Sequence, residues 1–154
     1  MANGTTLWIS GHFAERIRAH GVETYPHECC GALLGRDSDG THSNATREVL
    51  ALFPLVNRHR ESPRNRFTVT AEDVLDADRA AQQQGLEVIG WYHSHPDHPA
   101  RPSQFDQDHA WPWYSYIIVS VYRGAQQDMT SWRLNDDRHA FSPEGIEIRH
   151  SAAV

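Results

Sequence analysis

The segment from Gly85 to Pro96 restricts the fold of this chain more than any other. Residues 85–92 are apolar enough for a buried strand, and side chains two positions apart on a strand point to the same face. We therefore expect His93 and His95 to lie side by side. Pro96 lacks a backbone donor, so the strand should end there and leave both imidazoles at the end of a sheet.

The polar segment that follows is predicted to form a short helix beginning at Ser103. Residues three apart share a helix face, so Ser103 and Asp106 would point the same way. One interpretation is structural, with Ser103 as the N-cap and Asp106 as a favourable charge in the first turn. The other is functional, because three ligands drawn from His and Asp, plus one water, are typical of catalytic zinc. His93, His95 and Asp106 supply that set and predict one Zn²⁺ ion.

The remaining segments predict a mixture of helices and strands. Ser10 is expected to cap a first helix that ends near His20 and Gly21, because glycine suits a C-terminal cap. Helical spacing predicts a second helix over residues 71–84. Strands are predicted at residues 30–35, 45–55, 67–70, 116–121, 129–134 and 145–149, with a turn at 37–40 and a loop over 57–66. This order predicts an α+β domain in which a mixed β-sheet carries flanking helices.

Composition narrows the classes of partner and compartment. With 154 residues, the chain is expected to form one domain over residues 1–154. The balance of 14 basic and 20 acidic residues gives a net charge of -6, which disfavours nucleic acids and anionic membranes as partners. The two cysteines are adjacent, which disfavours a disulfide, and no apolar signal segment or membrane-length run occurs. These features predict a cytoplasmic protein.

Aromatic and cysteine residues near the motif have two interpretations. The aromatic side chains could wall a groove for an extended peptide, but core packing is the expectation for most of Trp91, Trp111, Trp113, Tyr114 and Tyr116. Cys30 is expected to be a small buried residue, since a reactive thiol needs a positively charged partner.

The spacing of the candidate ligands resembles the signature of a known family. His93-x-His95-Pro96, six further residues, and then Ser103-x-x-Asp106 is similar to the motif of the JAMM (MPN-plus) metalloproteases. That family also carries an upstream glutamate, commonly in a Glu-x-Cys-Gly segment, and this chain has Glu28-Cys29-Cys30-Gly31. The resemblance covers nearly the whole chain, lacks no position of the motif and is to the compact prokaryotic type.

The resemblance implies a fold and a mechanism. The fold would be a deaminase-like mixed sheet, with the metal between a strand end and the short helix. Zinc lowers the pKa of a bound water from about 16 to roughly 7. Glu28 would act as general base and pass the proton to the departing amine. Ser103 would donate its hydroxyl to the oxyanion of the tetrahedral intermediate.

The favoured activity is hydrolysis of an amide or isopeptide bond after the C-terminal glycines of a ubiquitin-like or sulfur-carrier protein with a diglycine tail, as the resemblance implies. One alternative is a noncatalytic MPN-type binding module for a ubiquitin-like partner, which would leave Glu28 and Ser103 unexplained. Another is a hydrolase of a small amide, because an open zinc site does not itself select a protein substrate. A zinc deaminase is rejected because it needs a Pro-Cys-x-x-Cys pair, whereas these two cysteines are adjacent.

Overall fold

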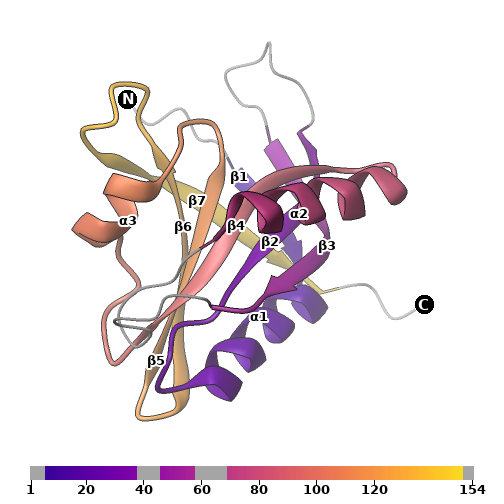
Figure 1. Ribbon diagram of the computed structural model, residues 1–154. Coiled ribbons are helices and arrows are strands. Elements are labelled where there is room, and N and C mark those ends of the chain that lie inside the picture. The colour runs from indigo at the N-terminus through magenta and orange to yellow at the C-terminus, as the bar shows by residue number, and fades with distance from the viewer. Residues whose placement is uncertain (1–5, 38–45, 58–68, 151–154) are drawn as a thin grey trace.

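Strands and helices share the part of the chain that the computed structural model describes, residues 6–37, 46–57 and 69–150. In order they are β1 (Thr6–Ser10), α1 (Gly11–Thr24), β2 (Cys30–Asp37), β3 (Thr46–Leu55), α2 (Ala71–Gln83), β4 (Glu87–Pro96), α3 (Gln104–His109), β5 (Ser115–Tyr122), β6 (Ala125–Leu134) and β7 (Phe141–Arg149). The strands join in the order β1-β3-β2-β4-β5-β6-β7, and β1 also pairs with β7, which closes the sheet into a barrel (Figure 1).

The sheet is mixed. β2 runs antiparallel to both β3 and β4, β4 and β5 are parallel, and β1 is parallel to both of its neighbours. The mixed sheet and its helices confirm the predicted α+β class. The closed barrel was not predicted, and it does not single out the deaminase-like fold that the resemblance implied. Closure depends on β1, a short strand that the sequence interpretation missed.

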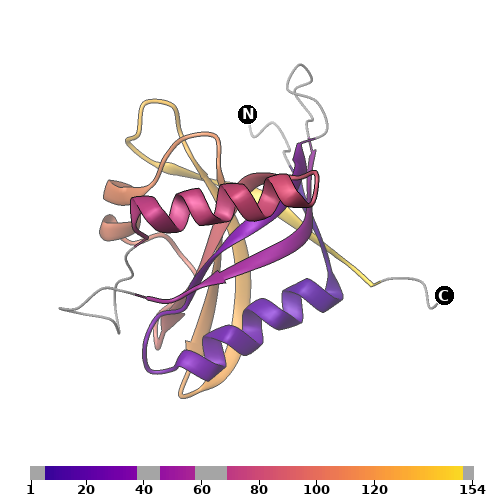
Figure 2. The same ribbon diagram turned by 45° about the vertical axis from the view of Figure 1, so that its right-hand side comes forward.

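Two helices cover opposite faces of the sheet (Figure 2). Ala14 and Ile17 of α1 pack into a core with residues of β1, β2, β4 and β5, while Ala77 and Ala81 of α2 pack into a second core that includes Trp91. Both faces of the central strands are therefore buried, which explains their nearly continuous apolar sequences.

The first helix is longer than predicted. Ser10 caps it, as expected, by accepting a hydrogen bond from the backbone N–H of Phe13. The expected end at Gly21 is wrong, because α1 continues to Thr24 and Gly21 is buried inside it. A Cβ atom at this position would lie 3.1 Å from Cγ2 of Val121 and 3.3 Å from Cβ of Ser94. Gly21 thus permits close packing of helix on sheet and does not end the helix.

Other predictions match the described elements. The hairpin is confirmed by the antiparallel pairing of β2 and β3, and the second helix is confirmed over Ala71–Gln83. β4 ends at Pro96, as predicted. Of the turn predicted at residues 37–40, Asp37 belongs to β2 and the rest lies outside the described residues, as does most of the loop over 57–66. The strand predicted at 67–70 is wrong for its described half, because residues 69 and 70 are not in a strand and Thr70 caps α2. No described helix is long and apolar enough to span a membrane.

Candidate active site

The end of β4 and the first turn of α3 bring three candidate ligands together. Nε2 of His93 lies 3.1 Å from Nε2 of His95. The Asp106 carboxylate reaches both rings, with Oδ1 3.2 Å from Nε2 of His93 and Oδ2 3.1 Å from Nε2 of His95. All three residues are buried. The predicted convergence of these side chains on one point is confirmed.

The geometry of this cluster fits a divalent metal ion. Ligand atoms about 2.0–2.2 Å from zinc at tetrahedral angles lie roughly 3.3–3.6 Å apart, close to the observed separations. Nδ1 of His95 lies 2.8 Å from the carbonyl oxygen of Pro99. A carbonyl oxygen only accepts, so Nδ1 carries a proton, and Nε2 is the nitrogen of this ring that faces Asp106. These three side chains could hold a metal ion, and imidazole ligands favour zinc over magnesium.

The Asp106 carboxylate is oriented by the helix that carries it. Ser103 caps α3: its Oγ accepts from the backbone N–H of Asp106 at 3.0 Å, and its own N–H donates to Oδ2 of Asp106 at 2.8 Å. Burial alone would raise the pKa of Asp106, but His93 and His95 outweigh it and hold that pKa far below its usual range. The structural and functional interpretations of the Ser103–Asp106 pair are therefore compatible.

Ser103 itself lies at the surface of the site. Its side chain is exposed, and the cap uses its oxygen as an acceptor. A hydroxyl also has one donor hydrogen, which the cap leaves available. The structure thus places a hydroxyl donor one helical turn from the candidate ligand Asp106.

Glu28 lies two residues before β2 and is 3% exposed. In an extended chain it shares a face with Cys30, which pairs directly with His93 across the sheet. Its Oε1 makes no hydrogen bond to any described residue. Burial, and then the negative charge of Asp106, raise the pKa of Glu28 to about 9. A carboxyl with such a perturbed pKa beside a ligand cluster is a candidate acid and base.

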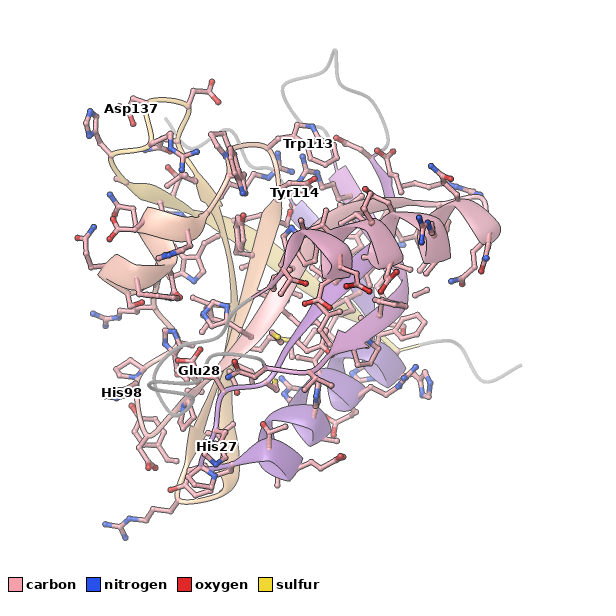
Figure 3. All side chains as sticks on the ribbon, in the orientation of Figure 1. His27, Glu28, His98, Trp113, Tyr114 and Asp137 are labelled. Atoms are coloured by element: carbon pink, nitrogen blue, oxygen red, sulfur yellow. The ribbon has the colours of Figure 1, made fainter. Side chains whose placement is uncertain are left out.

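The aromatic residues divide between core and surface. Trp91 and Tyr116 are buried as expected, but Trp111 and Trp113 are 63% and 44% exposed. Figure 3 shows Trp113 and Tyr114 well away from Glu28, so they do not wall a groove beside it. The two thiols are buried, and burial raises the pKa of Cys29 to about 12, which keeps that sulfur neutral and unreactive.

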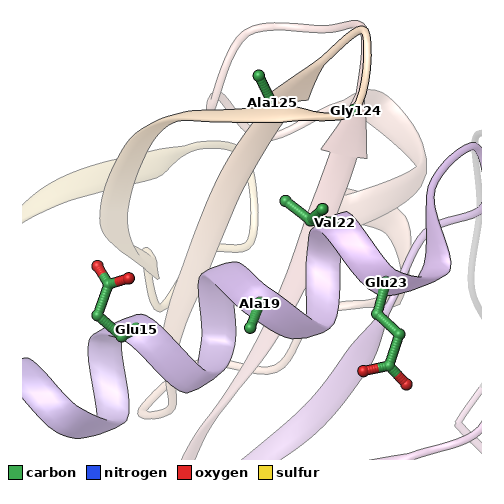
Figure 4. A pocket seen from close by; sticks show the side chains of 6 residues that line it. All are labelled: Glu15, Ala19, Val22, Glu23, Gly124 and Ala125. Atoms are coloured by element: carbon green, nitrogen blue, oxygen red, sulfur yellow. The ribbon is translucent and has the colours of Figure 1, made fainter.

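Two pockets differ in their relation to the site. One of about 500 Å³ adjoins Glu28 and is also lined by His20, His27, Leu55, Val56 and Asn57. The other, of about 520 Å³, lies between α1 and the β5–β6 turn and contains none of the candidate ligands (Figure 4); it is lined by Glu15, Ala19, Val22, Glu23, Gly124 and Ala125. Of these two pockets only the first is lined by Glu28, and His93, His95 and Asp106 line neither.

A mixed barrel thus holds two imidazoles and a carboxylate at a strand end, with a buried glutamate beside them, an arrangement that could bind a metal ion. Residues 11–135 match the family described as prokaryotic homologs of the JAB domain, and the chain belongs to this family. The resemblance to JAMM proteins is thereby confirmed.

Similar proteins come from several microorganisms. The chain is 38% identical over 96 residues to a desampylase of Haloferax volcanii, covering 62% of this chain and 63% of that protein. It is 33% identical over 119 residues to a probable TtuB-protein conjugate cleaving protease of Thermus thermophilus, covering 77% and 73%. A solution structure of a protein from Salinibacter ruber is 44% identical, with a TM-score of 0.69 and coverage of 93% and 91%. The desampylase match spans less than two thirds of that protein.

Proposed function

We propose that this protein is a zinc-dependent hydrolase that cleaves an amide or isopeptide bond after the C-terminal glycines of a ubiquitin-like or sulfur-carrier protein. The observation that carries the proposal is the buried cluster of His93, His95 and Asp106 beside Glu28. The substrate class is supported by the Thermus relative, which is named as a protease of protein conjugates. The proposed compartment is the cytoplasm.

The protein groups have distinct proposed roles. When bound, a zinc ion supplies Lewis acidity that makes an attacking water more acidic. Glu28 takes the proton of that water and delivers it to the departing amine. Ser103 donates its hydroxyl to the oxygen on which negative charge develops. Pro99 fixes the ring of His95 through its carbonyl, as outer partners of metal ligands commonly do.

The base must lose its proton to act. The raised pKa of Glu28 arises from burial and from Asp106, both of which oppose a second negative charge. A divalent cation held by the three ligands would offset this rise, because nearby positive charge favours the carboxylate. Metal binding and the ability of Glu28 to act as a base are therefore coupled in this proposal.

A noncatalytic binding module for a ubiquitin-like partner is the second candidate. In such a module, Glu28 would remain a buried carboxyl whose Oε1 lacks a hydrogen bond within the described chain, at a free-energy penalty and without a purpose. No observation favours this candidate over the hydrolase, but an experiment separates them.

The test uses mass spectrometry of a ubiquitin-like sulfur carrier that bears a C-terminal cysteine or short peptide. The zinc-loaded protein is compared with its Glu28→Gln variant and with Glu87→Gln, which changes an exposed glutamate on β4. We expect release after the terminal glycine by the wild type and by Glu87→Gln only, with zinc retained in all three. Carriers whose terminal glycines are replaced by valine should resist cleavage. Equal partner capture by all forms, without turnover by any, would favour the binding module.

A further inference from the structure

The strand β2 begins at the same residue toward both of its neighbours. Its first residue, Cys30, pairs with Leu55 of β3 on one side and with His93 of β4 on the other. Glu28 comes two residues earlier and therefore lies beyond this ladder. The Oε1 atom of its carboxyl makes no hydrogen bond to a described residue, so no such bond at Oε1 fixes the orientation of the side chain. The position of this side chain consequently depends on how its main chain is held.

The strand on one side holds the main chain of Glu28 through a side chain. Asn57 lies two residues beyond Leu55, where the pairing with β2 has ended. Its Nδ2 donates to the carbonyl oxygen of Glu28 at 3.1 Å. Asn57 and Glu28 also line the same pocket of about 500 Å³. The amide of Asn57 thus continues the contact between β3 and β2 by one further hydrogen bond.

The strand on the other side holds the next residue in a similar way. Oγ of Ser94 accepts from the backbone N–H of Cys29 at 2.8 Å, and the Ser94 N–H donates to the Cys29 carbonyl oxygen at 3.2 Å. Ser94 is fully buried and lies between the two histidine ligands in sequence. Its side chain points to the opposite face from theirs, where Gly21 packs close to its Cβ. Ser94 therefore ties residue 29 to the strand that carries the ligands.

We infer that Asn57 and Ser94 are positioning residues that fix Glu28 relative to the ligands on β4 by holding the main chain of residues 28 and 29 from both neighbouring strands. This inference rests on the proposed function, because it presupposes that Glu28 transfers protons. Neither residue belongs to the ligand cluster. Their loss should therefore disturb the chemical step and leave the metal in place.

The expected effect follows from the geometry of proton transfer. A misplacement of about 1 Å in a reacting group can lower the rate about 100-fold. We expect Asn57→Ala and Ser94→Ala to lower kcat by roughly 10- to 100-fold, with KM within about twofold of the wild type. Asn57→Asp should be at least as impaired, because it places an acceptor against the carbonyl oxygen of Glu28. Asn57→Gln keeps an amide donor and should recover part of the rate.

The test measures kcat, KM and zinc affinity for these variants, together with hydrogen exchange of the Cys29 amide in the metal-free protein. The matched controls are Asn135→Ala and Ser142→Ala, which remove an exposed hydrogen bond between those two side chains. We expect the controls to match the wild type. Ser94→Ala should keep its zinc affinity and show faster exchange at Cys29, and Asn57→Ala should have no further effect in a Glu28→Gln background.

Three outcomes would overturn the inference. The first is a kcat for both alanine variants equal to that of the controls. The second is a further loss of kcat, similar to that in the wild type, when Asn57→Ala is added to Glu28→Gln. A loss of zinc affinity that accounts for the whole loss of activity would show that these residues support the metal ligands and not Glu28. If the wild type itself turns over no conjugate, the proposed function fails first, whereas normal turnover by the wild type and both variants refutes the positioning role alone.

Discussion

Replacing Glu28 by glutamine is expected to stabilise the metal-free protein at neutral pH, although it removes the proposed base. The carboxyl is buried, and burial followed by the charge of Asp106 raises its pKa to about 9. In the unfolded chain the same group has a pKa of about 4.3. Between these values the folded state keeps a proton that the unfolded state releases. The stabilisation from this group is therefore present in full below about pH 4.3 and is lost as the pH rises toward 9.

The magnitude follows from the interval between pH 4.3 and the working pH. At pH 7 the interval is about 2.7 units, and each unit corresponds to about 1.4 kcal/mol, so the loss is on the order of 4 kcal/mol. Glutamine does not titrate and escapes this loss. Near pH 5 the two proteins should differ little, because the group is then close to its unfolded pKa. The stability gap should widen steadily between pH 5 and 8.

Urea denaturation of chelator-treated proteins at pH 5, 6, 7 and 8 measures this gap. Glu87→Gln is the matched control, because Glu87 is exposed and its replacement should leave the pH dependence unchanged. The reasoning is refuted if the free energy of unfolding has the same pH dependence in the wild type and in Glu28→Gln. Such a result would mean that the folded chain relaxes enough to hydrate the carboxylate.

Three further predictions concern the metal, the helix cap and the core. Chelation should leave the chain folded but lower its melting temperature, since free zinc at 100 times its Kd stabilises the folded state by about 2.7 kcal/mol. An unfolded circular dichroism spectrum after chelation would contradict this prediction. Ser103→Ala should lose about 1 kcal/mol of cap stability and lower kcat about 100-fold. Ser103→Asp should restore the stability of the cap, measured in thermal melts, but should not restore kcat. Equal recovery of stability and kcat in Ser103→Asp would exclude a donor role for the hydroxyl. Gly21→Ala places a Cβ 3.1 Å from Val121 and 3.3 Å from Ser94, so calorimetry should show destabilisation of about 1–3 kcal/mol, and an unchanged melting temperature would mean that α1 shifts freely.

The cluster of candidate ligands was predictable because each of its parts obeys a local period. His93 and His95 share a face through the two-residue repeat of a strand, and Ser103 and Asp106 share a face through the turn of a helix. Neither relation needs knowledge of the rest of the chain. Proline and the capping residue also marked where β4 ends and α3 begins. Residue types and their spacing were therefore sufficient for these positions.

The barrel and the support of Glu28 were not predictable in this way. Closure requires β1 to pair with β7 near the other end of the chain, for example Thr6 with Gly145, and no local period encodes that pairing. Asn57 has no motif around it, and its contact with Glu28 exists only because β3 lies beside β2. The length of α1 escaped prediction for a related reason. Gly21 looks like a helix end in the sequence, but the surface it packs against comes from Ser94 and Val121.

The antiparallel pairing of β2 and β4 places the start of one strand beside the end of the other, so Glu28 meets the ligands at one end of the barrel. This arrangement buries two carboxyls, on Glu28 and Asp106, near two imidazoles. In the protein alone, burial and then repulsion by Asp106 favour a proton on Glu28, as the raised pKa of that residue indicates. A divalent cation balances both carboxylates and removes the need for that proton. The burial that makes a charged Glu28 unfavourable in the metal-free fold would therefore suit the metal-loaded site of the proposed hydrolase, in which Glu28 acts as the base.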